Sequence, residues 1–220
     1  GATVAAPPAQ TPVAAGSVAP AALAPPGGLP VQPPLLPVTA AQQPSLSVVG
    51  IYWQRALTAA PASEPAFDAT HAYVALRDGT LVAVSVESGL IDWLATQPTT
   101  VGLTAAAGRV VGACDRDVWV RDGTTGQPQW QVTLGAKVAV GPAVVADTVI
   151  AATDTGEIIA LALSDGTPRW HARLDAIAST PLTVGGDQVF VGAPDGRVFA
   201  LSGVTGSRVW TRPLRGKITA

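Results

Sequence analysis

Short apolar stretches separated by glycine- and aspartate-containing turns fill the chain from about residue 66 onward. The segment 143–174 shows the pattern most clearly, with turns at Asp154-Thr155-Gly156 and Ser164-Asp165-Gly166. Apolar runs of this length, or period-two alternation bounded by such turns, are typical of β-strands. No segment has the sustained 3.6-residue periodicity of a long helix. The strands predicted for this segment are 143–145, 149–152, 157–163 and 169–174.

The same pattern recurs along the chain, and tryptophan marks it. Five of the six tryptophans are spaced by 40, 37, 40 and 40 residues: Trp53, Trp93, Trp130, Trp170 and Trp210. A turn glycine precedes each of the last four by four residues: Gly89, Gly126, Gly166 and Gly206. Ten residues before each of these lies a second turn position: Gly79, Arg116, Gly156 and Gly196. A repeated four-stranded unit of about 40 residues predicts the blade of an all-β propeller.

Four blades are predicted, and one of them departs from the pattern. In the second blade Asp115-Arg116-Asp117 replaces the usual Asp-Gly turn, and Trp119 enters the third strand outside the tryptophan register. The four predicted blades cover about residues 66–97, 101–137, 138–175 and 178–215.

The N-terminal region differs in composition from the repeats. Residues 1–50 contain 11 of the 20 prolines and 12 alanines, and the first charged residue is Arg55. Proline fixes φ and removes backbone donors, so residues 1–46 are predicted to form a disordered Pro/Ala-rich linker. Prolines interrupt every stretch long enough to span a membrane, and no basic segment precedes an apolar core as in a signal peptide. The chain has no methionine, so we expect its start to be processed or truncated.

The repeat resembles a known family. The pattern Asp-Gly-x-(Val/Leu/Ile)-x-Ala-(Leu/Val), followed by Thr/Ser/Asp-Gly-x-x-x-Trp, is similar to the pyrroloquinoline-quinone-like (PQQ-like) repeat. That repeat occurs in quinoprotein dehydrogenases and in the outer-membrane protein assembly factor BamB, a periplasmic lipoprotein. The resemblance covers about residues 47–220 and implies a ring of seven or eight blades, in which the repeated tryptophans pack between neighbouring blades.

The two ends of the repeat region predict an incomplete ring. Residues 47–57, which include Trp53, look like a lone fourth strand that closes a blade whose first three strands lie elsewhere. Residues 213–220 parallel 135–139, the entry to the third blade, so a further repeat begins where the sequence stops. A closed four-bladed ring is the alternative, but it gives Trp53 no obvious place.

Charge and candidate chemistry narrow the function. A net charge of −2 without clustered cations argues against a nucleic-acid surface. The single Cys114 cannot form an internal disulfide and is interpreted as a small buried residue. The turn aspartates are expected to bond their own turn backbones, and His71 and His171 have no accompanying nucleophile motif. The low-ranked binding candidates are Asp115, Asp117 and Trp119. The first two are candidates for a metal-binding pair, and Trp119 is either an exposed contact residue or, as the favoured interpretation, part of the local core.

These observations favour a non-catalytic, exported propeller that binds proteins, similar to the outer-membrane assembly lipoprotein. Its partners would be outer-membrane assembly components or unfolded β-barrel segments, and its location the bacterial cell envelope. One alternative is the extracellular sensor of a membrane protein kinase. Another is a fragment of a PQQ-dependent dehydrogenase, but the adjacent cysteines that the resemblance implies for such enzymes cannot occur with one cysteine. Neither PQQ nor calcium is expected as a cofactor.

Overall fold

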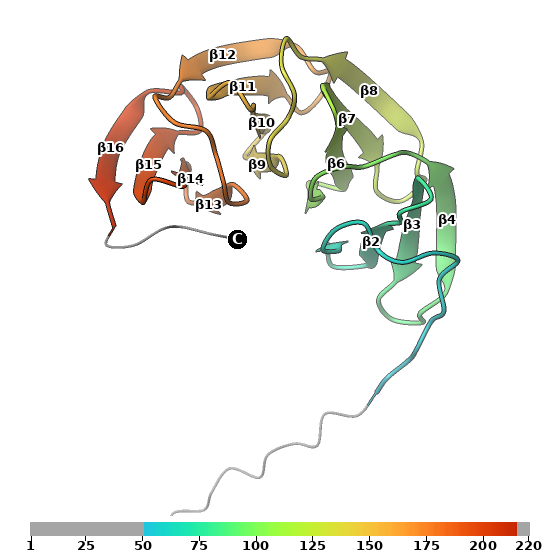
Figure 1. Cartoon of the computed structure of the whole chain (residues 1–220). Helices are drawn as coiled ribbons and strands as arrows, with labels where there is room; N and C mark the ends of the chain where they lie inside the picture. The colour runs from blue at the N-terminus through green and yellow to red at the C-terminus, as the bar shows by residue number, and fades with distance from the viewer. Residues whose placement is uncertain (1–50, 215–220) are drawn as a thin grey trace, which may run out of the picture. The chain divides into compact units, whose positions relative to one another are not determined.

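The computed structural model describes residues 51–214 of the 220-residue chain, so the predicted linker 1–46 lies outside the described residues. The described part contains sixteen strands and no helix. They form four four-stranded antiparallel sheets, each built from four consecutive strands. The all-β propeller architecture is therefore confirmed, and Figure 1 shows the blades following one another in chain order.

The four blades have nearly the same strand lengths. The first contains β1 (Ala66–Phe67), β2 (His71–Ala75), β3 (Thr80–Ser85) and β4 (Ile91–Thr96). The second contains β5 (Thr104–Ala106), β6 (Arg109–Cys114), β7 (Asp117–Asp122) and β8 (Pro128–Thr133). The third contains β9 (Ala143–Val145), β10 (Thr148–Ala152), β11 (Glu157–Ala162) and β12 (Pro168–Arg173). The fourth contains β13 (Thr183–Gly185), β14 (Gln188–Gly192), β15 (Arg197–Ser202) and β16 (Arg208–Pro213).

The strand order within each blade places the first and fourth strands at opposite edges. The first strands of neighbouring blades contact one another, whereas β4, β8, β12 and β16 lie on the outside of the arc (Figure 1). Each blade has a register shift where its third strand meets its fourth, close to the repeated tryptophan. The tryptophans are thus carried on the outermost strand of each blade.

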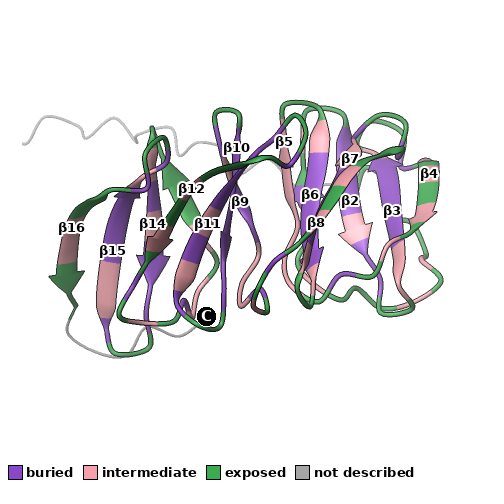
Figure 2. Ribbon diagram, turned by 90° about the horizontal axis from the view of Figure 1, so that it is seen from above, coloured by how far each residue is buried: buried purple, intermediate pink, exposed green. Residues whose placement is uncertain are grey.

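The core lies mainly between the blades. Successive apolar clusters join the first blade to the second, the second to the third and the third to the fourth. The middle strands supply most of the fully buried side chains and appear purple in Figure 2. In the second and third blades these strands are covered on both faces by neighbouring sheets, and they read as nearly continuous apolar runs in the sequence.

The irregular turn of the second blade is a tight hairpin. Asp115 and Arg116 join β6 to β7, and Asp115 takes φ = 54°. Aspartate tolerates this left-handed conformation better than most residues. The other three blades use Gly79, Gly156 and Gly196 at φ between 81° and 86° in their corresponding turns.

The predicted closing strand over 47–57 is not seen in its described portion. Residues 51–57 have no strand assignment, and residues 47–50 lie outside the described residues. A strand needs a hydrogen-bonded neighbour, and within the described part this segment lies against the face of the first blade without a sheet of its own. No helix in the described part is long and apolar enough to span a membrane.

Candidate binding surface at the blade joints

Each joint between blades is made by a tryptophan of one blade and a backbone carbonyl of the next. Trp93 Nε1 donates to the Gly123 oxygen at 2.8 Å, Trp130 Nε1 to Leu163 at 2.9 Å, and Trp170 Nε1 to Gly203 at 3.0 Å. The three carbonyls belong to the first residue after the third strand of the following blade. The joint thus combines burial of a large ring with a satisfied indole N–H.

The turn glycine that precedes each tryptophan in the sequence forms the other half of a joint. Gly126, Gly166 and Gly206 have φ between 70° and 76°, and their α-carbons face the tryptophan ring of the preceding blade. A β-carbon would lie 2.3–2.8 Å from the nearest ring atom. Glycine is needed there both for positive φ and for the close approach of the backbone to the ring.

The first blade receives its tryptophan from the N-terminal segment. Trp53 Nε1 donates to the Val86 oxygen at 2.8 Å, and the Trp53 ring lies against Gly89, whose φ is 68°. This is the geometry of the three joints between blades. We call the half of a joint that carries the tryptophan the donor half, and the half that carries the carbonyl and turn glycine the acceptor half.

The acceptor half of the first blade continues into an apolar face. Leu76, Val82 and Val84 are buried there, and Leu57 and Ala59 of the N-terminal segment pack against them. A cavity of about 320 Å³ remains between residues 56–58 and strands β3 and β4. Ile51 and Tyr52 of the same N-terminal segment are exposed.

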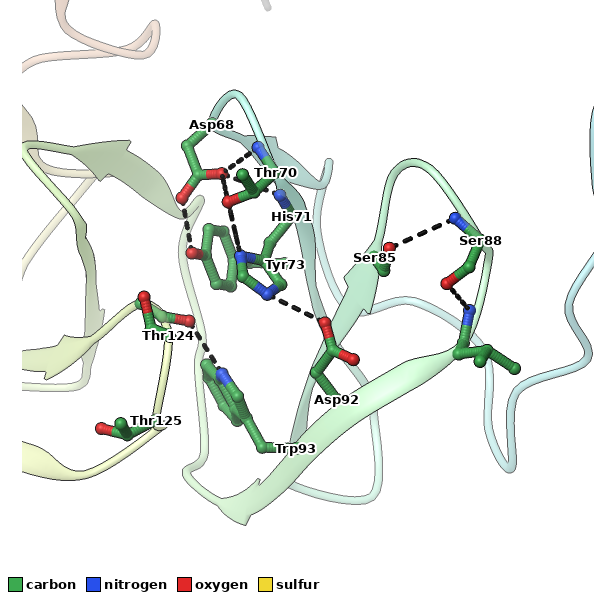
Figure 3. Close-up of polar contacts among 12 residues, drawn as sticks. Asp68, Thr70, His71, Tyr73, Ser85, Ser88, Asp92, Trp93, Thr124 and Thr125 are labelled. Carbon is green, nitrogen blue, oxygen red and sulfur yellow. Dashed lines mark hydrogen bonds and ion pairs between the residues drawn. The ribbon is translucent and has the colours of Figure 1, made fainter.

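A polar cluster lies at the start of β2, on the side of the first blade that faces the second blade (Figure 3). Asp68 Oδ1 accepts bonds from the backbone N–H groups of Thr70 and His71 and from the Thr70 hydroxyl, at 2.7–2.9 Å. Asp68 Oδ2 accepts the Tyr73 hydroxyl at 2.6 Å. His71 Nε2 lies 2.9 Å from Asp92 Oδ2 on β4. The cluster therefore ties the β1–β2 loop to the outer strand of the same blade.

The charge state of the cluster follows from these bonds. Burial alone would raise the pKa of Asp68, but hydrogen bonds from Tyr73, Thr70 and His71 outweigh it and lower the pKa to about 2. Burial, followed by the bond to Asp68, raises the pKa of Tyr73. The Thr70 hydroxyl donates its single hydrogen to Asp68 Oδ1, so toward His71 Nδ1, 2.9 Å away, its oxygen can only accept. That second hydrogen bond forms when Nδ1 carries the proton. Near neutral pH, Asp68 is therefore ionised and Tyr73 is neutral.

Two hollows in the described part could receive a ligand. A depression of about 370 Å³ beside the polar cluster is lined by Thr70, His71, Glu87 and Asp92 among others. A second hollow of about 200 Å³ lies where the first strands gather and is lined by prolines, glycines, leucines, Thr104 and one carboxylate, Glu64. Among the described residues no three His, Cys, Asp or Glu side chains are grouped to hold a metal ion.

The predicted binding candidates of the second blade do not form one site. Trp119 is 1% exposed and packs in the core between the first and second blades, so the interpretation as an exposed contact residue is wrong and that as local core is right. The glycine at the paired position 112 leaves room for its ring, which the sequence pattern alone did not show. Asp117 accepts bonds from Gln131 and Thr133 on β8, at 2.9 Å and 2.5 Å. Asp115 is exposed at the hairpin.

Three of the four turn aspartates bond as expected, and no such bond is seen for Asp154. Asp78, Asp165 and Asp195 each accept the backbone N–H two residues later, at 2.9–3.0 Å. The polar cluster around His71 was missed, because its members come from a loop and from β2 and β4. The sequence feature that could have indicated the cluster is Asp68-Ala69-Thr70. These three residues join β1 to β2, where the other blades have two-residue turns.

The joints, the repeat and the fold agree with comparison to known proteins. The profile of the family described as outer membrane protein assembly factor BamB matches residues 107–219, just over half of the chain. The chain belongs to this family of PQQ-like propellers. No curated protein matches the sequence.

Solved structures share the fold of this family member at low sequence identity. BamB from Moraxella catarrhalis is 24% identical with a TM-score of 0.61, over 70% of this chain and 49% of that protein. A europium-containing methanol dehydrogenase is 16% identical with a TM-score of 0.62, over 73% and 43%. A quinohemoprotein alcohol dehydrogenase from Pseudomonas putida HK5 is 13% identical with a TM-score of 0.58, over 69% and 34%. The chain thus spans half or less of the length of each of these proteins.

Proposed function

We propose that this PQQ-like propeller is a non-catalytic protein-binding scaffold exported to the bacterial cell envelope. The observation that carries the proposal is that strand edges and apolar side chains are exposed, whereas the ionisable groups are held in hydrogen bonds. Strand edges and apolar faces are open at the outside of the blades, whereas the charged groups with shifted pKa values are engaged in turns and strand-to-strand bonds. Membership of the BamB family supports an envelope location and protein partners.

The residues present do not fit the quinone cofactor of the dehydrogenase relatives. One cysteine cannot supply an adjacent pair, and Glu64 is the single carboxylate among the residues lining the inner hollow. Calcium prefers six or more oxygen ligands, several of them carboxylates. We therefore expect the chain to need neither PQQ nor calcium.

The outer strands give the proposal its binding mode. β4, β8, β12 and β16 each lie at a sheet edge, and an extended peptide can add to such an edge through main-chain hydrogen bonds. Alternate side chains of the added strand would meet exposed apolar residues such as Leu94 on β4 and Val209 on β16. An unfolded β-barrel segment has this chemistry, because apolar and polar side chains alternate along its strands.

A direct binding measurement tests the function. A fluorescent peptide with alternating aromatic and polar residues, of the length of a β-barrel strand, is titrated with the 220-residue chain and followed by anisotropy. The matched control is the same peptide with N-methylated amides along one edge, which keeps the side chains but removes the donors. We expect saturable binding of the first peptide and loss of binding for the second.

The competing enzyme function is tested in parallel. The chain is incubated with PQQ and calcium and assayed for dye reduction with alcohols and sugars. Dye reduction above that of heat-unfolded chain, together with no saturable peptide binding, would replace the scaffold by a dehydrogenase.

A further inference from the structure

The outer strands of the blades differ in how well their open edges are protected against pairing. Strands β8 and β12 begin with Pro128 and Pro168, whereas β4 begins with Ile91 at the equivalent position, next to the register shift. Proline occurs on edge strands where the sheet does not need the backbone N–H. The blade therefore does not need the N–H of Ile91, and the edge of β4 lacks the proline that protects the other two edges.

The exposed side chains of β4 are also less protective than those of β8 and β12. Leu90 is 57% exposed and Leu94 is 60% exposed. The equivalent residues of the second and third blades are polar and are also exposed: Gln127, Gln131, Thr167 and His171. Those two blades have a neighbour on each side, so the exposure belongs to the position within a blade. An exposed apolar edge of this kind marks a site of strand pairing.

The charge beside this edge is negative. The Asp92 side chain on β4 is 43% exposed, and Glu87 in the turn before β4 is exposed. Both line the depression of about 370 Å³ beside the polar cluster, and no lysine or arginine is among the described residues that line it. This side of the edge therefore suits a basic side chain.

Leu94 and Asp92 lie on opposite faces of the first blade. Leu94 pairs with Val82, which belongs to the face covered by the N-terminal segment. Asp92 reaches His71, which lies toward the second blade (Figure 3). A strand added beside β4 would also present alternate side chains to these two faces. The edge is thus complementary to a segment with apolar residues on one face and basic residues on the other.

We propose that the edge of β4 binds an extended segment of another protein in which apolar and basic residues alternate. The segment continues the sheet of the first blade through main-chain hydrogen bonds. Its apolar side chains pack on Leu94, and a lysine or arginine reaches Asp92 and Glu87. This inference rests on the proposed scaffold function and specifies the blade that binds and the chemistry of the partner.

The other outer strands disfavour the same segment. Strand β8 begins with proline and has glutamines at its exposed positions, so it offers no apolar contact of this kind. Strands β12 and β16 carry exposed arginines, which repel a basic segment: Arg169, Arg173, Arg208 and Arg212. The proposal therefore predicts one preferred edge within the described propeller.

The first test compares two peptides. A fluorescent peptide of alternating leucine and lysine residues, used below the concentration at which it self-associates, is titrated with the 220-residue chain and followed by anisotropy. The matched peptide has glutamate in place of every lysine. We expect the lysine peptide to bind about tenfold more tightly, because it pairs with the two carboxylates that repel the glutamate peptide.

Two variants of β4 locate the binding edge. Ile91→Pro gives β4 the residue that β8 and β12 already have, so the blade should fold, and affinity for the lysine peptide should fall about tenfold. Leu94→Lys should weaken binding to a similar extent. Gln131→Lys is its matched control, because it adds the same charge at the equivalent position of β8, and it should leave the affinity unchanged. Circular dichroism checks the fold of each variant.

A double variant tests the charge. Glu87→Gln combined with Asp92→Asn should remove the preference for lysine over glutamate, while an amide oxygen remains to accept from His71. The control combines Asp115→Asn with Asp154→Asn, two exposed turn residues, and changes the net charge by the same amount elsewhere. We expect this control to keep the preference.

The outcomes separate this inference from the function on which it rests. Tighter binding of the lysine peptide, lost in the β4 variants and kept in the controls, supports it. Equal binding of both peptides, or an affinity unchanged by Ile91→Pro and Leu94→Lys, overturns it and leaves the scaffold function standing. If neither these peptides nor the aromatic–polar peptide binds saturably, the scaffold function fails and the inference fails with it.

Discussion

Trp170 on the outer strand of the third blade donates its indole N–H to the carbonyl oxygen of Gly203 in the fourth blade, 3.0 Å away. The donor and acceptor are 33 residues apart, as are Trp130 and Leu163, while Trp93 and Gly123 are 30 apart. The spacing stays close to one repeat because each contact reaches a single blade ahead. Stability of the propeller is therefore carried by nearest-neighbour joints, as in other repeat proteins.

The indole hydrogen bond can be removed without changing the shape of the ring. Replacing Trp130 by benzothienylalanine exchanges the N–H for sulfur and leaves the Leu163 carbonyl without its donor. We expect the free energy of unfolding to fall by about 1–2 kcal/mol in urea titrations. Trp119 is the control, because its buried Nε1 has no partner among the described residues. The same exchange at 119 should be neutral or stabilising, and an equal loss at both positions would contradict the assigned role of the bond.

Alanine substitution can distinguish the turn glycines that contact a tryptophan ring from turn glycines that only need a positive φ. Gly166→Ala puts a β-carbon 2.8 Å from the Trp130 ring and also strains φ, so we expect a loss of at least about 3 kcal/mol. Gly186→Ala has the same kind of backbone strain with open space around the β-carbon, and should cost about 1 kcal/mol. Thermal or urea unfolding of the two variants checks the difference. Similar losses would show that the ring contact contributes little.

The inner ends of the second and third blades approach each other through glycine. A β-carbon on Gly141 would lie 3.0–3.2 Å from backbone atoms of Gly102, which cannot move aside as a flexible side chain can. Gly141→Ala should destabilise the propeller by about 1–3 kcal/mol. Gly135→Ala is the control, with nothing near its β-carbon, and should be neutral or stabilise by at most about 1 kcal/mol. The opposite ranking in chemical unfolding would count against a close blade contact.

The Asp68 cluster predicts a defined loss of stability in acid. The pKa of Asp68 is lowered from 3.8 to about 2 in the folded protein, so its contribution is present above pH 3.8 and is lost as the pH falls toward 2. The shift corresponds to at most about 2 kcal/mol, because the side chain is partly exposed.

Unfolding titrations between neutral and acidic pH test this contribution. Asp68→Asn should flatten the acid dependence of the unfolding free energy. Tyr73→Phe removes one donor to Asp68, so it should shift the loss to higher pH. An Asp68→Asn variant with the acid dependence of the unaltered chain would refute the assignment.

Local chemistry explains why so much of the fold could be predicted. The turns at Asp154-Thr155-Gly156 and Ser164-Asp165-Gly166, and the apolar runs between them, are readable within a few residues, and the strands of the third blade follow the predicted ranges closely. The closing strand over 47–57 was not found in its described portion, because a strand depends on a neighbour that local pattern does not reveal. Trp119 was left between two interpretations because its burial depends on the first blade and on Gly112.

By itself the sequence determined the repeat, the four strands of each blade and the need for glycine at two turns. These follow from periodicity and backbone conformation, which act over short stretches of chain. Only the tertiary structure decided that each turn glycine covers the tryptophan of the preceding blade, and that Trp53 fills this position on the first blade. It also brought Asp68, Tyr73, His71 and Asp92 together. The physical reason is that a joint forms between two sheets, so its partners are set by how blades stack rather than by the residues next to them in the chain.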